Sequence, residues 1–167
     1  FLSASAERAS EHPLGQAIVA GAEAAGVTPA EPRNFQAVPG KGIAADVAGK
    51  KVRLGNRRLL EEGGLDLTQY EKEIAALEND GKTAMLLLVD GALAGVVAVA
   101  DTVKENALAG IAELRRLGLK VYMLTGDNRR TAEAIARQVG IDDVLAEVLP
   151  EDKARKVEEL KRQGLTV

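Results

Sequence analysis

The sequence predicts an α/β protein in two parts: an antiparallel sheet with flanking helices, followed by part of a parallel sheet with helices on its faces. Two observations predict this. Up to about residue 100 the chain shows a helix, short strands, further helices and a strand pair, and beyond that point strands and helices alternate strictly. The 167 residues are 46% apolar, which is enough to bury a core.

The first long helix is expected to begin at Pro13 and to end at Gly26. Pro13 cannot continue a preceding helix, so a break is predicted at Ser10–His12. On one continuous helix Glu7 and His12 would lie about 140° apart, whereas across a break they can converge. His12 is the only histidine. Its ring either caps the helix or packs near Pro13, or it faces a nucleobase together with Glu7.

Short strands are predicted at 43–47 and 51–54, and helices at 56–62 and 68–79. Two apolar runs then flank Asp90 and Gly91, which is a strong hairpin signal. These hairpin-connected strands, with the two helices between them in the chain, predict an antiparallel sheet covered by helices.

The second part should begin with a helix that Thr102 and Glu105 start as a capping box and Gly118 ends. The strand LKVYML, the segment TGDN, a helix, the strand DVLA and the helix of LPEDKARKVEELKRQG follow. The final LTV reads as the start of another strand, so we expect the chain to be a fragment of a longer protein.

Two loops of this second part are expected at the carboxyl edge of the parallel sheet, where such sheets bind ligands. Thr125, Gly126 and Asp127 follow one strand, and Lys153 follows the next. A hydroxyl, a glycine, free helix amides and a lysine suit a phosphate group. The alternative is an ordinary turn in which Asp127 or Asn128 caps the helix, with a solvated Lys153.

Glycines in the first part are equally ambiguous. Gly40 and Gly42 in GKG, and Gly55 before Asn56, either make turns or let a ligand approach the backbone closely. Neither segment matches a P-loop or a Rossmann fingerprint.

Composition argues against several classes of function. The net charge is −3 with no basic cluster, so nucleic acid is not an expected partner. The chain has no cysteine, and one histidine makes a poor metal site. The longest apolar run contains Asp90 and Gly91, so no bilayer insertion is expected.

The segments SEHPLGQAI, GKGIAA, LGN, MLTGDNRRTAEAIA and LPEDK together resemble the heavy-metal P-type ATPases, most closely the copper exporters. The resemblance runs from Glu7 to Val167. It implies a nucleotide-binding domain at residues 1–97, joined to the C-terminal half of a haloacid-dehalogenase-like phosphorylation domain at 98–167. It also implies a cytoplasmic location on an integral membrane pump, with the actuator and transmembrane domains as partners.

The same resemblance implies ATP and Mg²⁺ as cofactors, and residue roles follow from the matching motifs. Glu7 and His12 would recognise adenine, and the nucleotide pocket would be shaped by Gly40, Gly42, Gly55 and Asn56. Thr125 and Lys153 would hold the transferred phosphoryl group, with Gly126 and Asp127 completing the motif. Asp101 would lie at the hinge between the domains.

Two motifs of the family do not occur in the sequence: DKTGT, with the phosphorylated aspartate, and GDGxND, which binds magnesium. The chain is therefore expected to bind nucleotide without completing catalysis. A zinc or cadmium exporter, and a phosphatase of the haloacid dehalogenase type with a cap domain, stay open as alternatives.

Overall fold

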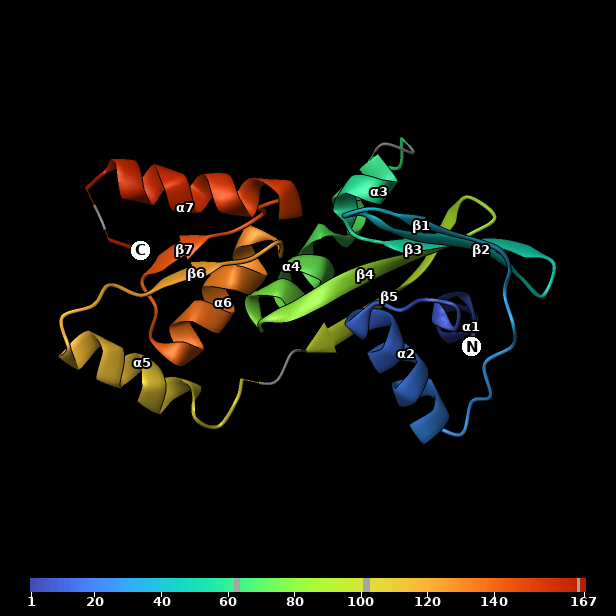
Figure 1. Ribbon diagram of the computed structural model, residues 1–167. Helices are drawn as coiled ribbons and strands as arrows, with labels where there is room; N and C mark the ends of the chain where they lie inside the picture. The colour runs from blue at the N-terminus through green and yellow to red at the C-terminus, as the bar shows by residue number, and fades with distance from the viewer. Residues whose placement is uncertain (62–63, 101–102, 165) are drawn as a thin grey trace. The chain divides into compact units, whose positions relative to one another are not determined.

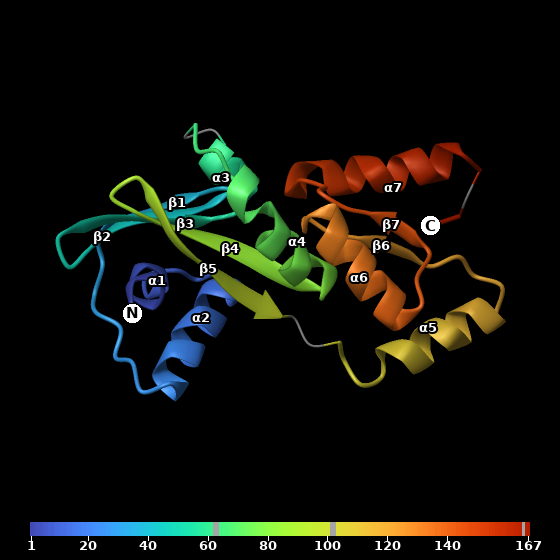
Figure 2. The same cartoon turned by 180° about the vertical axis from the view of Figure 1, so that it is seen from behind.

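The computed structural model describes residues 1–61, 64–100, 103–164 and 166–167 (Figures 1 and 2). The chain forms two compact units. Unit 1 consists of Phe1–Leu77 and Ala84–Ala100, and unit 2 of Glu78–Thr83 and Asp101–Val167 as far as they are described. The two units thus divide close to residue 100, with the short turn before residue 84 grouped with the second.

Unit 1 is built on a five-stranded sheet whose spatial order follows the chain. The strands are β1 (Arg33–Val38), β2 (Gly42–Val47), β3 (Lys50–Gly55), β4 (Lys82–Val89) and β5 (Ala92–Ala100). The pairs β1–β2, β2–β3 and β3–β4 are antiparallel. This confirms the predicted antiparallel sheet.

Two of its turns show why the strands reverse where they do. Ala48 and Gly49 have φ values of 49° and 76°, and Asp90 and Gly91 have φ values of 52° and 86°. Two successive residues with positive φ match the right-handed twist of the strands that they join. The predicted hairpin at Asp90–Gly91 is therefore present, between β4 and β5.

Helices cover both faces of this sheet. Helices α1 (Leu2–Glu7) and α2 (Pro13–Ala24) pack on one face, with α1 against β2 and β3 and α2 against β5. The other elements are α3 (Arg57–Glu61), the short 3₁₀ helix η1 (Thr68–Tyr70) and α4 (Glu71–Asn79). Figure 1 shows α3 on the opposite side of the sheet from α1 and α2.

The core of unit 1 is accordingly split into two layers by the alternation of strand side chains. Along β4, Met85 belongs to the layer under α1 and α2, while Leu86 and Leu88 belong to the layer with α3 and α4. Leu54 and Leu86 are fully buried, one in each layer. The site residues of this unit therefore stand on a rigid support.

Unit 2 contains the alternating elements. These are α5 (Ala107–Arg116), β6 (Tyr122–Leu124), α6 (Arg129–Val139), β7 (Asp143–Leu145), η2 (Pro150–Asp152) and α7 (Lys153–Arg162). Strands β6 and β7 pair in parallel, as predicted. Gly140 ends α6 with a φ of 75°, the left-handed value that glycine adopts without strain.

The structure differs from the predictions at β1, α1 and the start of α5. Strand β1 and helix α1 were not predicted as elements. Helix α5 begins at Ala107 and not near Thr102, and its N-cap, Asn106, makes no side-chain capping bond. Thr102 lies outside the described residues, but Glu105 lies in a turn and not in a helix, so the predicted capping box does not start α5. Leu165 is likewise outside, and residues 166–167 are not in a strand.

No helix in the described ranges has both the length and the apolar character that crossing a bilayer requires.

Candidate functional site

The entrance to α2 contains the break that Pro13 predicts. His12 is the N-cap residue, with an extended backbone at φ −74° and ψ 136°, and Pro13 occupies the first helical position. The Leu14 N–H donates to Nδ1 of His12 at 3.2 Å. The helix-capping interpretation of His12 is therefore confirmed.

Helix capping engages only one of the two ring nitrogens of His12, Nδ1. When Nδ1 accepts a hydrogen bond, a neutral ring carries its hydrogen on Nε2. His12 is exposed to solvent. The neutral ring thus has one tautomer favoured by the Leu14 hydrogen bond, and its Nε2–H has no hydrogen-bond partner among the described residues.

In contrast to the exposed His12, Glu7 places its carboxyl group inside the protein. It is the last residue of α1 and is only 3% exposed. Its Oε2 is buried and has no hydrogen-bond partner among the described residues. Burial raises the pKa of Glu7 above its ordinary value, while hydrogen bonding from the Ser10 side chain and, when the His12 ring is protonated, its charge act in the opposite direction. The two predicted adenine-recognising residues are thus close enough to interact.

The predicted glycines come together with Asn56 at the β1–β2 turn. Gly42 and Gly55 are directly paired across β2 and β3. A Cβ atom on Gly42 would overlap the Leu54 carbonyl oxygen, and one on Gly55 would overlap the Lys41 carbonyl oxygen and the Leu59 side chain. Close backbone packing therefore requires glycine at both positions.

Asn56 links the β1–β2 turn to helix α3 by hydrogen bonds. Its Nδ2 donates to the Gly40 carbonyl oxygen at 2.8 Å, and its Oδ1 accepts from the Leu59 N–H at 3.4 Å. Its backbone N–H donates to the Lys41 carbonyl oxygen at 2.8 Å. The four residues predicted from GKG and LGN thus form one cluster at the end of the sheet where β3 leads into α3.

In unit 2, the loop of Thr125–Asn128 follows the carboxyl end of β6. The Thr125 hydroxyl donates to Asp127 Oδ2 at 2.6 Å and accepts from the Asp127 N–H at 3.1 Å. Asn128 caps α6, because its Oδ1 accepts from the Thr131 N–H at 3.0 Å. The capping alternative is therefore confirmed for Asn128.

The segment after β7 lies along the same loop. The Val148 N–H donates to the Thr125 carbonyl oxygen at 3.0 Å, and the Glu147 N–H donates to that of Asp127 at 2.9 Å. A Cβ atom on Gly126 would lie 3.5 Å from the Val148 carbonyl oxygen. Lys153 begins α7 with an exposed side chain. The two predicted loops thus lie at one edge of the β6–β7 pair.

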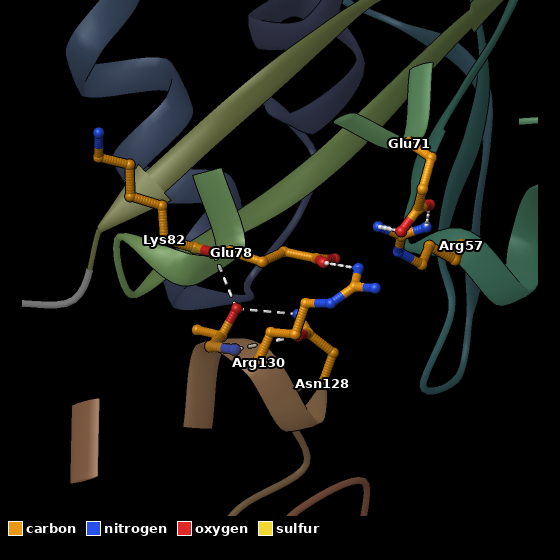
Figure 3. Close-up of polar contacts among 7 residues, drawn as sticks. Arg57, Glu71, Glu78, Lys82, Asn128 and Arg130 are labelled. Carbon is orange, nitrogen blue, oxygen red and sulfur yellow. Dashed lines mark hydrogen bonds and ion pairs between the residues drawn. The ribbon is translucent and has the colours of Figure 1, made fainter. Parts of the chain in front are cut away.

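Sequence reasoning missed an anchor that unit 2 builds around the first turn of α6 (Figure 3). Arg130 pairs with Glu78, whose carboxyl group is almost fully buried, at 3.1 Å. The Thr131 hydroxyl donates to the Lys82 carbonyl oxygen at 2.9 Å and accepts from Asn128 Nδ2, also at 2.9 Å. The Arg130–Glu78 and Thr131–Lys82 contacts join residues about fifty positions apart in the chain, so no local pattern indicates them. They hold the helix that follows the Thr125 loop.

Figure 3 also shows an ion pair in unit 1, between Arg57 at the start of α3 and Glu71 at the start of α4. Asp101, predicted at the hinge, lies outside the described residues.

Comparison with known proteins assigns the family. Residues 2–167 match the family of haloacid dehalogenase-like hydrolases. The chain belongs to this family. A small parallel sheet with α6 and α7, and functional candidates at its carboxyl edge, accords with that membership.

Within the haloacid dehalogenase-like family, the similar proteins are metal pumps. The chain is 46% identical over 166 residues to a copper-exporting P-type ATPase of Staphylococcus saprophyticus, covering 99% of this chain and 21% of that protein. It is 48% identical over 166 residues to a copper-transporting P-type ATPase of Rhizobium leguminosarum, covering 99% of this chain and 20% of that protein. The chain thus spans about a fifth of these relatives and is homologous to part of a P-type ATPase.

A solved structure agrees with this assignment. The crystal structure of a zinc-transporting PIB-type ATPase in its E2.Pi state matches with a TM-score of 0.61 and 35% identity. The match covers 97% of this chain and 26% of that one. The predicted fold class is therefore confirmed.

Proposed function

We propose that this chain is the ATP-binding part of a copper-exporting P-type ATPase. Residues 1–97 serve as its nucleotide-binding domain and residues 98–167 as the C-terminal half of its phosphorylation domain. The parent protein couples ATP hydrolysis, through an aspartyl phosphate formed outside this chain, to metal export. It carries this part on the cytoplasmic side of the membrane, together with its actuator and transmembrane domains.

One observation carries the proposal: the Glu7 carboxyl group, buried with an Oε2 that has no hydrogen-bond partner among the described residues, shares the Ser10 side chain with the exposed residue His12. Proteins rarely bury a polar atom without a partner, because desolvation is then uncompensated. A nucleobase edge supplies donors and acceptors that meet both residues. Glu7 and His12 then recognise adenine, and the cluster of Gly40, Gly42, Gly55 and Asn56 shapes the rest of the pocket.

In unit 2 the proposed task is to hold a phosphoryl group. The Thr125 hydroxyl and the amides around Gly126 and Asp127 supply donors, and Lys153 supplies a positive charge. The Thr125–Asp127 hydrogen bond orients the hydroxyl in advance. These residues neutralise and position charge, which is most of what phosphoryl transfer requires of a protein.

Mg²⁺ accompanies ATP in this proposal and neutralises phosphate charge when bound. The described parts of the chain contain no group of three or more His, Cys, Asp or Glu side chains that could hold a metal ion. Copper is proposed as the exported ion because curated relatives at 46% and 48% identity are copper pumps. A zinc-transporting ATPase of known structure, at 35% identity, makes zinc the alternative.

The experiment that tests the proposal separates the helix-capping role of His12 from its proposed role in adenine recognition. His12→Asn keeps a good N-cap residue while removing the imidazole, because asparagine is among the best helix N-caps. We expect ATP binding, measured by titration calorimetry, to weaken about tenfold, the equivalent of one net hydrogen bond. The unfolding temperature should stay close to that of the wild type.

Glu11→Ala is the matched control, because Glu11 is exposed and adjacent to His12. It should bind ATP as the wild type does. An unchanged dissociation constant for His12→Asn, or no ATP binding by the wild type, would contradict the proposal.

A further inference from the structure

The segment between α1 and α2 contains a serine whose hydroxyl group meets both proposed recognition residues. The His12 N–H donates to Ser10 Oγ at 3.2 Å. The Ser10 side chain also lies against the Glu7 carboxyl group, where its hydrogen bonding lowers the pKa of that group. The Ser10 N–H in turn donates to the Glu7 carbonyl oxygen at 2.8 Å, which fixes the turn.

Gly15, in the first turns of α2, faces the same group of atoms. It is buried, and a Cβ atom on it would overlap Glu7 Oε2 and lie 3.0 Å from Ser10 Oγ. The Glu7 carboxyl group therefore occupies the space that a side chain at position 15 would fill. Its position depends on Gly15 as well as on Ser10.

We propose that Ser10 and Gly15 are positioning residues of the adenine site: Ser10 links Glu7 to the His12 backbone, and Gly15 leaves the space in which the Glu7 carboxyl group lies. This inference rests on the proposed function above. Neither residue needs to touch the ligand. Together they fix the distance between a buried carboxyl group and an exposed imidazole that belong to different helices.

The hydrogen bonds of Ser10 and His12 explain why these two residues stand at the break before α2. Because the His12 N–H is held by Ser10 and His12 Nδ1 is held by Leu14, both the backbone and the ring of His12 are fixed. Loss of the Ser10 hydroxyl releases the backbone of His12, and the Nδ1 cap then weakens with it. The tautomer of the ring therefore reports on Ser10 even when no nucleotide is present.

The first test uses the fact that the chain has a single histidine. Long-range ¹H–¹⁵N NMR of the ligand-free chain, at about pH 8 where an ordinary imidazole is neutral, reads its tautomer directly. The wild type should show Nδ1 unprotonated and Nε2 protonated. Ser10→Ala should shift both nitrogens toward the average of the two tautomers, and Ser10→Thr, which keeps a hydroxyl, should restore the wild-type shifts.

Calorimetric titration with ATP is the second readout. Ser10→Ala should raise the dissociation constant about two- to tenfold, and Ser10→Thr should recover most of that loss. Wild-type binding by Ser10→Ala, together with unchanged nitrogen shifts, would overturn the role of Ser10 while leaving the proposed function intact. Failure of the wild type to bind ATP would instead remove the proposed function itself.

A pair of glycines in α2 tests the second half of the proposal. Gly15→Ala and Gly21→Ala should bring a similar gain in helix propensity, because both lie within α2. Only the Cβ at position 15 would strike Glu7, since in the part of the chain that the structure describes no neighbouring atom lies within 4 Å of a Cβ at position 21. Gly15→Ala should weaken ATP binding and Gly21→Ala should not. Equal dissociation constants for the two variants would refute the positioning role of Gly15.

Discussion

Replacing Glu7 by methionine should stabilise the ligand-free protein and abolish its recognition of ATP. The Glu7 carboxyl group is buried, and its Oε2 has no hydrogen-bond partner among the described residues. Methionine has a similar length and no strongly polar atom, and its flexible side chain fills irregular space in a core. The substitution therefore removes a desolvation cost without leaving a cavity.

The magnitude follows from the unpartnered oxygen. A buried polar group without a partner costs about 1–3 kcal/mol, and part of that gain is offset because the Ser10 hydroxyl loses its acceptor. We expect a net stabilisation of about 1 kcal/mol. For a unit of roughly 60–100 residues this corresponds to an increase of about 4–8 °C in the unfolding temperature.

The pKa shift of Glu7 predicts how the stability gain of Glu7→Met changes with pH. Because burial raises the pKa of Glu7 in the folded chain above its ordinary value of 4.5, the folded state binds this proton more tightly than the unfolded state. The Glu7 contribution to the free energy of unfolding therefore decreases as pH rises from about 4.5 through the folded-state pKa, and stays low above it. Glu7→Met lacks this decrease, so its advantage over the wild type should be largest at neutral pH.

Differential scanning calorimetry across this pH range measures the effect, and ATP titration of the same samples measures recognition. Glu11→Met is the control: Glu11 is exposed, and its replacement should change stability by no more than about 0.5 kcal/mol. A Glu7→Met variant that is less stable than the wild type at neutral pH would refute the reasoning, because it would show that the protein satisfies this carboxyl group.

Two further predictions concern the supports of the proposed sites, both measured by urea denaturation. Gly55→Ala should destabilise unit 1 by about 1–3 kcal/mol, because its Cβ overlaps the Lys41 carbonyl oxygen and the Leu59 side chain; an unchanged midpoint would mean that β2 and β3 separate easily. Asn128→Ala should cost about 1 kcal/mol through loss of the α6 cap, and Asn128→Asp, which keeps a capping oxygen, should restore most of it. Equal destabilisation by both Asn128 variants would argue against capping as the cause.

Local chemistry explains what was predictable in the fold. The Asp90–Gly91 hairpin, the start of α2 at Pro13 and the end of α6 at Gly140 each depend on the backbone preferences of one or two residues. The parallel pairing of β6 and β7 follows from their connection through α6. Such features need no knowledge of distant contacts.

Elements without such local signals were missed. Strand β1 has a mostly exposed pattern, an irregular register between Arg33 and Gln36, and a positive φ of 49° at Asn34, so its residues show no clean alternation. Its strand conformation comes from pairing with β2. At α5 the expected start near Thr102 was wrong because the helix forms only from Ala107, without a side-chain cap.

The proposed sites likewise combine features set by neighbouring residues with features set by contacts between distant residues. The sequence by itself determined that the chain breaks before α2 and that the TGDN and LPEDK segments follow β6 and β7 as loops, because turns, caps and strand ends are set by neighbouring residues. Only the tertiary structure decided that Glu7 is buried with an oxygen that has no partner in the described ranges while His12 stays exposed, and that Glu78 and Lys82 hold the first turn of α6. Burial and long-range pairing depend on how helices pack on a sheet, and that packing sums contacts between residues far apart in the chain.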